Sequence, residues 1–255
     1  MLQFSQLLNF LSRAAEANTD AVKMMMKKKF LAGSLAAIVA ALFAGIWWLD
    51  AQFEEPDAVI AKSIAGELGA KSVLAIFAHP DDEQLVTGLL IRARERDGAI
   101  TRIITATKGE AGTQLPQVAR QEELGVIRHA ELLKNGYALG VKEQLVWDYP
   151  DGGVADVDFE GYVTRLENQI AIWKPDLIVT FWPESGFSDH ADHKVVSKAA
   201  VEAVRRHRES NPEGAPNAIA FILAPRRMMS RFAGDTGKII AANQPAPSYA
   251  MPGEG

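Results

Sequence analysis

Apolar runs and amphipathic stretches alternate along the C-terminal four-fifths of the chain. The short apolar runs, each ending in a polar turn, predict strands at 72–78, 100–106, 144–147, 176–182 and 218–223. The longer stretches between them carry apolar residues at helical spacing and predict helices at 83–97, 117–135, 158–173 and 191–207. Strands that alternate with helices of this length indicate a mostly parallel sheet with helices on both faces.

The N-terminal fifth follows a different pattern. Residues 30–49 are twenty consecutive residues without a charge. At about 1.5 Å per residue, a helix of that length spans roughly 30 Å, the thickness of a bilayer core. Lysines occupy positions 27–29, and Trp47 and Trp48 lie near the far end. The positive-inside rule then predicts a cytoplasmic N-terminus and an extracytoplasmic large domain.

A cleaved signal peptide is the alternative for this segment. It would place the large domain in the same compartment, but the apolar stretch is long for a signal, and no small-x-small cleavage site follows Trp48. We therefore expect a single-pass membrane anchor.

The predicted organisation has five parts, and the fold class is α/β, a Rossmann-like mostly parallel sheet plus an N-terminal transmembrane helix. The parts are a cytoplasmic segment at 1–29, the anchor at 30–49, a linker at 50–69, the α/β domain at 70–230 and a C-terminal extension at 231–255. From Pro245 onward we expect irregular structure, because the segment is rich in proline and glycine.

Charge and cysteine content exclude several classes of function. The net charge is −5, and residues 1–50 carry +2, which leaves −7 on residues 51–255. An acidic body argues against nucleic-acid binding, which needs a basic surface. The chain has no cysteine, so disulfides, thiolate zinc sites and cysteine nucleophiles are excluded. The oligomeric state has no signature in the sequence.

The strand at 72–78 ends in His79-Pro80-Asp81-Asp82-Glu83. Helix initiation alone explains the proline and the acidic residues, which are favoured in a first helical turn. It does not explain His79. Ligands of open α/β sheets bind at the carboxyl ends of the strands, which is where this imidazole and these carboxylates are expected.

The strand at 176–182 is followed by a second group of the same kind, residues 189–193, Asp-His-Ala-Asp-His. Three of the five histidines therefore follow strand ends, whereas His129 and His207 lie on helical patterns among charged residues. Two histidines and one carboxylate form a typical catalytic zinc set, with a fourth position for water. A further carboxylate can take the proton of that water, so the set suits hydrolysis.

These motifs resemble the PIG-L/LmbE-like family of zinc-dependent N-deacetylases. The resemblance rests on AHPDDE at 78–83 together with HADH at 190–193, and it covers about residues 70–225. Weaker similarities are TKGE at 107–110, RQEEL at 120–124, LGV at 139–141 and Asp148. Position 191 is alanine where the family commonly has proline.

The resemblance implies a role for each matching residue. The ligands it implies for Zn²⁺ are His79, Asp82 and His193. Asp81 would be the general base, and a nearby cation would keep its pKa low. His190 would stabilise the oxyanion or protonate the leaving amine, with Asp192 orienting it, and Arg120 would contact the substrate sugar.

The expected function is zinc-dependent N-deacetylation of an N-acetylated amino sugar, by a hydrolase anchored in a membrane and acting on a glycan or glycolipid. Two alternatives stay open: a zinc amidase that cleaves another amide, such as a thiol conjugate, and a non-catalytic metal-dependent glycan-binding protein. A nucleotide-binding domain is disfavoured, because the strand at 72–78 leads into carboxylates where a phosphate site needs a glycine-rich loop.

Overall fold

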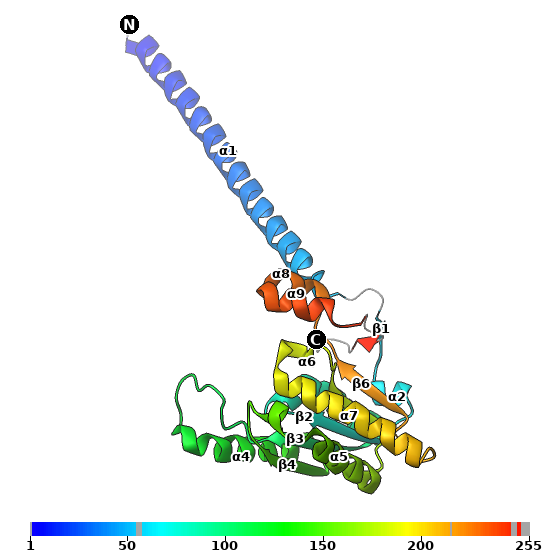
Figure 1. The fold of residues 1–255 in the computed structure, drawn as a ribbon. Coiled ribbons are helices and arrows are strands. Elements are labelled where there is room, and N and C mark those ends of the chain that lie inside the picture. The colour runs from blue at the N-terminus through cyan, green and yellow to red at the C-terminus, as the bar shows by residue number, and fades with distance from the viewer. Residues whose placement is uncertain (1, 55–57, 215, 246–248, 251–255) are drawn as a thin grey trace. The chain divides into compact units, whose positions relative to one another are not determined.

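The computed structural model describes residues 2–54, 58–214, 216–245 and 249–250 (Figure 1). It has two units, Met1–Phe53 and Glu54–Gly255. The described part of the first unit is dominated by one continuous helix, α1 (Leu2–Asp50). Its segment Lys23–Asp50 is long and apolar enough to cross a membrane by length and composition, and none of it is buried. A signal sequence would satisfy the same criteria.

The second unit is built on a five-stranded sheet in which every neighbouring pair is parallel. In spatial order its strands are β4 (Glu143–Tyr149), β3 (Ile100–Thr107), β2 (Ser72–Phe77), β5 (Leu177–Phe181) and β6 (Ala218–Ile222). The predicted parallel α/β sheet is confirmed, and each strand lies within two residues of its expected bounds.

The strands of this sheet are connected by the helices α3 (Thr87–Asp97), α4 (Gln121–Leu139), α5 (Phe159–Trp173), α6 (Gly186–Asp189) and α7 (Ala191–Ser210), with short 3₁₀ turns at Asp82–Val86 and Val154–Asp156 (Figure 1). Helix α2 (Ile64–Glu67) precedes the sheet in the chain, and α8 (Arg226–Phe232) and α9 (Gly234–Ala242) follow its last strand.

The side chains of β2 alternate between two hydrophobic cores. Val73, Ala75 and Phe77 pack into the core shared with α2 and α3, whereas Leu74 and Ile76 pack into the core shared with α5 and α7. Successive residues of a strand point to opposite faces, so a strand without an exposed face must be apolar at every position. This is why β2 reads as a continuous apolar run.

Helix α4 differs from its prediction at both ends. It was expected at 117–135 with Gly136 as the stop, but it runs from Gln121 to Leu139. Gly140, at φ 68°, is the residue that ends the helix. Gly136 lies inside the helix and does not end it. A Cβ at this position would be 2.1 Å from the Gln144 side chain, so the glycine allows that side chain to pack closely against the helix.

The segments on either side of the sheet hold more structure than expected. Helix α2 and the short strand β1 (Val59–Ile60) lie in the segment predicted as a linker. β1 pairs in parallel with β7 (Tyr249–Ala250), which lies in the tail predicted to be irregular. The rest of that tail, 246–248 and 251–255, lies outside the described residues.

The strand order changes direction beside β2. The chain proceeds from β2 through β3 to β4 on one side, and then returns to β5 and β6 on the other. In open α/β sheets, such a switch point leaves a crevice at the carboxyl ends of the two central strands. The residues that follow β2 and β5 therefore meet at one place.

Candidate functional site

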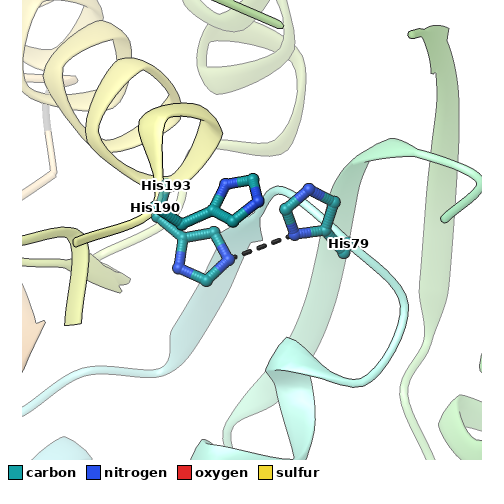
Figure 2. A group of neighbouring side chains, drawn as sticks. All are labelled: His79, His190 and His193. Atoms are coloured by element: carbon teal, nitrogen blue, oxygen red, sulfur yellow. Dashed lines mark hydrogen bonds between the residues drawn. The ribbon is translucent and has the colours of Figure 1, made fainter. Parts of the chain in front are cut away.

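The site is centred on His79, two residues beyond the end of β2. Its imidazole is buried, and its Nδ1 lies 3.1 Å from Nε2 of His193. On the other side of the ring, Nε2 lies 3.1 Å from Oδ1 of Asp151 and 3.2 Å from Oδ2 of Asp192. Figure 2 shows the imidazoles of His79, His190 and His193 gathered together, the last two from the start of α7.

The three expected metal ligands converge. Oδ1 of Asp82 lies 3.3 Å from Nε2 of His193, and its Oδ2 lies 3.7 Å from Nδ1 of His79. The Asp82 carboxylate is held in place by the amides of Ala78 and His79, which donate to Oδ2 at 3.2 and 2.9 Å.

This donor set fits zinc. Tetrahedral Zn²⁺ with bonds of about 2.0–2.1 Å places neighbouring ligand atoms about 3.3 Å apart. His79 Nδ1 and His193 Nε2 lie 3.1 Å apart. The Asp82 carboxylate approaches His193 Nε2 through Oδ1 at 3.3 Å and His79 Nδ1 through Oδ2 at 3.7 Å. Among the described residues, two groups have potential ligand atoms that all lie within 4.8 Å of one another: His79, His190 and His193, and His79, Asp151 and Asp192. Neither group includes Asp82.

Negative charge accumulates around His79. Burial disfavours its charged form, but hydrogen bonds to Asp151 and Asp192 outweigh that effect, and the pKa of His79 rises to about 9. The neighbouring carboxylate of Asp82 acts in the same direction. The cluster therefore favours a positive charge, either a proton or a metal ion.

Asp81, the expected general base, lies at the edge of the cluster in a strained conformation, at φ 106°. Its Oδ2 accepts a hydrogen bond of 2.7 Å from Nη2 of Arg128. Burial raises the pKa of Asp81, and Arg128 only partly opposes that rise. This direction applies to the metal-free protein, so the expected low pKa of Asp81 beside a bound cation stays a prediction.

His190 caps the N-terminus of α7. Its side chain Nδ1 accepts a hydrogen bond of 3.2 Å from the backbone amide of Asp192. The residue is exposed, and burial of part of the ring, together with the neighbouring His79 and His193, lowers its pKa.

Asp192 takes a different place from the one expected. Its carboxylate is fully buried, contacts Nε2 of His79 and accepts hydrogen bonds from the amides of Gly152 (2.8 Å) and Val154 (3.1 Å). Only its backbone amide contacts His190. The Asp192 carboxylate is directed toward the turn after β4, where it contacts the His79 imidazole. It is therefore placed to orient His79 and not His190.

Arg120, the expected substrate contact, is exposed at the start of α4 and pairs with Glu122 and Glu123. None of its described contacts is with the histidine cluster. Arg128, further along the same helix, does reach the site: besides Asp81, it donates to the backbone carbonyls of Pro80 and Gly109.

Sequence reasoning missed two residues of this site, Asp151 and Arg128. Asp151 had a usable signal, because it closely follows an apolar strand, as His79 follows β2. Asp148, which matched the family pattern, instead forms an exposed ion pair of 2.8 Å with Lys108. Arg128 had no such signal, since an arginine on an amphipathic helix is ordinary surface composition.

Comparisons with known proteins identify the family of the chain. Residues 74–204 match the family model of GlcNAc-PI de-N-acetylase, PIG-L. A 1D-myo-inositol 2-acetamido-2-deoxy-alpha-D-glucopyranoside deacetylase of Corynebacterium urealyticum is 32% identical over 179 residues, 60% of this chain and 53% of the relative. A probable N-acetyl-alpha-D-glucosaminyl L-malate deacetylase 2 of Bacillus cereus is 31% identical over 138 residues, 53% of this chain and 62% of the relative.

The chain thus spans a little over half the length of these curated relatives. Among solved structures, the N,N'-diacetylchitobiose deacetylase from Pyrococcus horikoshii matches with a TM-score of 0.50 at 21% identity, covering 71% of this chain and 74% of that one. At that identity the match supports the fold.

Proposed function

Because the chain belongs to the PIG-L family of GlcNAc-PI de-N-acetylases, we propose that it hydrolyses the acetamide of an N-acetylated amino sugar, releasing acetate and the free amine. The observation that carries the proposal is the convergence of His79, Asp82 and His193 at ligand spacing, beside a spare carboxylate and a third imidazole. The relatives named as deacetylases of N-acetylated glucosamine conjugates support the same substrate class.

In this proposal, His79, Asp82 and His193 hold Zn²⁺. The ion, when bound, supplies Lewis-acid polarisation of the acetamide carbonyl and lowers the pKa of a water molecule. Asp192 and Asp151 contact Nε2 of His79 and so orient the ring with Nδ1 toward the other two ligands. Such partners of a ligating histidine fix its tautomer and direction.

Asp81 acts as the general base, since its carboxylate lies beside the ligand set without being needed as a ligand. It takes a proton from the attacking water and passes it to the leaving nitrogen. Burial raises the pKa of Asp81 in the metal-free protein, and a bound cation beside it would lower that pKa and keep the base ionised.

His190 acts as a neutral hydrogen-bond donor to the developing oxyanion. Because its Nδ1 accepts the amide proton of Asp192, the imidazole proton is on Nε2. Charging the ring would cost that capping hydrogen bond, and the lowered pKa of His190 acts in the same direction. Of its two expected roles, the geometry favours stabilisation of the oxyanion over donation from an imidazolium.

We further propose that α1 anchors the protein in a membrane with the α/β unit on the extracytoplasmic side. The proposal is supported by the apolar Lys23–Asp50 segment and by the lysines at 27–29 on its N-terminal side. A substrate carried on a lipid or on an envelope glycan would then lie within reach. Residues 70–230 would carry the catalytic machinery.

The test measures zinc and acetate separately on the full-length protein in detergent. Wild type should bind one zinc and release acetate from N-acetylglucosamine conjugates. Asp81→Asn should keep its zinc and lose about 10²–10⁴-fold in rate, the usual contribution of a general base. His79→Ala should lose the metal.

Each rival function has its own outcome in this experiment. If the protein binds zinc and binds the sugar but releases no acetate from any N-acetylated sugar, it is a glycan-binding protein. Cleavage of a thiol-conjugate amide in place of the sugar acetamide would indicate the other amidase. Full zinc content in His79→Ala would rule out the metal site itself.

A further inference from the structure

The turn before α7 has an unusual backbone. Three of its residues, Gly186, Phe187 and Asp189, have φ values of 53°, 61° and 65°. For a bulky residue such as phenylalanine, a positive φ is a strained outlier, and such strain persists only where surrounding contacts impose it. The turn is closed by backbone hydrogen bonds from Gly186 to Trp182 (2.7 Å) and from Asp189 to Ser185 (2.8 Å).

This backbone path brings a carbonyl oxygen against a catalytic-site imidazole. Nδ1 of His193 lies 2.9 Å from the carbonyl oxygen of Gly186 and 3.2 Å from the hydroxyl of Ser188. A carbonyl oxygen can only accept a hydrogen bond, so this contact favours the tautomer with the proton on Nδ1. In the neutral ring, the lone pair is then on Nε2.

That nitrogen faces the metal-ligand cluster. Nε2 of His193 lies 3.1 Å from His79 Nδ1 and 3.3 Å from Asp82 Oδ1. The ring is also fixed in its plane, because Phe181 stacks on it with centroids 4.3 Å apart and planes 15° apart. Phe187 stacks on Phe181 in turn, at 6.1 Å and 28°.

We infer that the turn of residues 185–189 is a positioning element for the metal site: the Gly186 carbonyl sets His193 in the Nδ1–H tautomer and keeps its Nε2 lone pair available as a ligand. The inference rests on the proposed function, since it assigns a role to residues around the proposed zinc ligand. It also assigns a role to the strained conformation of Phe187, which belongs to the same turn as the Gly186 carbonyl.

Glycine is required at position 186 for two reasons. Its φ of 53° disfavours any side chain, and a Cβ there would lie 3.0 Å from His193 Cβ and 3.0 Å from Lys194 Cγ. Gly186→Ala therefore moves the carbonyl away from Nδ1 or pushes on the first turn of α7. Gly98 is a matched control: its φ is 65°, but a Cβ there meets nothing within 4 Å.

The first measurement needs no variant and no metal. Nitrogen-15 NMR of the imidazoles in metal-free wild type, at a pH where the ring is neutral, should show the His193 proton on Nδ1. A proton on Nε2 would overturn the inference.

The second measurement is zinc affinity by chelator competition. Gly186→Ala should weaken zinc binding about 10–100-fold, the usual effect of removing a partner that orients a ligating histidine, and should shift the tautomer toward Nε2–H. Gly98→Ala should lose stability but keep both the tautomer and the affinity. Equal loss of affinity in the two variants would make the effect one of stability alone and would overturn the inference.

These readouts use no substrate, so they are independent of the deacetylase test. Acetate release could fail with the tautomer as stated, or succeed with the tautomer reversed, and the two proposals would then be separated.

Discussion

Single residues of the site differ most in how they hold protons. The buried imidazole of His79 lies among the carboxylates of Asp82, Asp151 and Asp192, which raise its pKa to about 9 although burial alone would lower it. A zinc ion needs the unprotonated nitrogen of this ring. Metal and proton therefore compete for the same position.

This competition predicts a pH dependence of zinc binding. Below about pH 9, where His79 is protonated in the metal-free protein, the apparent zinc affinity should rise about tenfold per pH unit, and it should level off above that pH. In Asp151→Asn, which replaces a charged hydrogen-bond acceptor of His79 with a neutral one, the levelling should occur at a lower pH. Competition titrations across the range measure both, and an affinity independent of pH up to about 9 would contradict the assignment.

The positions of individual residues were only partly predictable from the sequence. His79 and His193 could be placed near strand ends because each follows an apolar run, whereas the ligand roles of these residues and of Asp82 came from the family resemblance and stay a prediction. The contact between Asp192 and His79 could not be predicted, because the direction of the Asp192 carboxylate depends on where the turn at Gly152 lies in space. The role of Arg128 could not be predicted for the same reason. It contacts the HPDD turn (residues 79–82) at Asp81, which lies 47 residues away in the sequence.

At the level of elements, the HPDD turn after β2 is attached to α4 through Arg128. The guanidinium donates to Asp81 at 2.7 Å, to the Gly109 carbonyl at 3.1 Å and to the carbonyl of Pro80. The Arg128 side chain thus joins α4 to the turns that follow β2 and β3. It also provides the positive charge that opposes the rise in the pKa of Asp81.

Arg128→Met should therefore shift the acid limb of the pH–rate profile. Without the guanidinium, the pKa of Asp81 rises further, so the base is protonated at a higher pH and activity at the acidic end is lost first. Arg128→Lys keeps a positive charge and should recover much of the profile. Acetate release measured against pH, with zinc content as the control, decides this; a uniform loss at every pH would point to a structural effect alone.

The elements themselves were predicted unevenly. A strand that is buried on both faces is apolar at nearly every position, so its ends are visible in the sequence and its bounds agreed with the prediction. Helix bounds depended on single glycines, and Gly136 and Gly140 cannot be told apart until the packing against Gln144 is known. β1 and β7 have two residues each and lie far apart in the sequence, so their pairing leaves no sequence pattern.

At the level of the whole molecule, the proposed membrane anchor α1 would determine the compartment in which the α/β unit works. If the lysines at 27–29 orient it, a C-terminal reporter that is active only outside the cytoplasm should be active on the full chain. Replacing those three lysines with glutamine should weaken the orientation and reduce the reporter signal. Activity of a cytoplasm-only reporter on the unaltered chain would contradict the proposed topology.

The reversal of strand order beside β2 has a consequence for how the protein acquires its metal. His79 and His193 are 114 residues apart, and they meet because β5 pairs directly with β2 in the centre of the sheet. The entropy cost of closing so long a loop is met by the sheet and its two cores before any ion arrives. In the proposed site, zinc would then add stability to a crevice that the sheet assembles by itself, and the apoprotein should be folded, unlike a zinc finger that cannot fold without its metal.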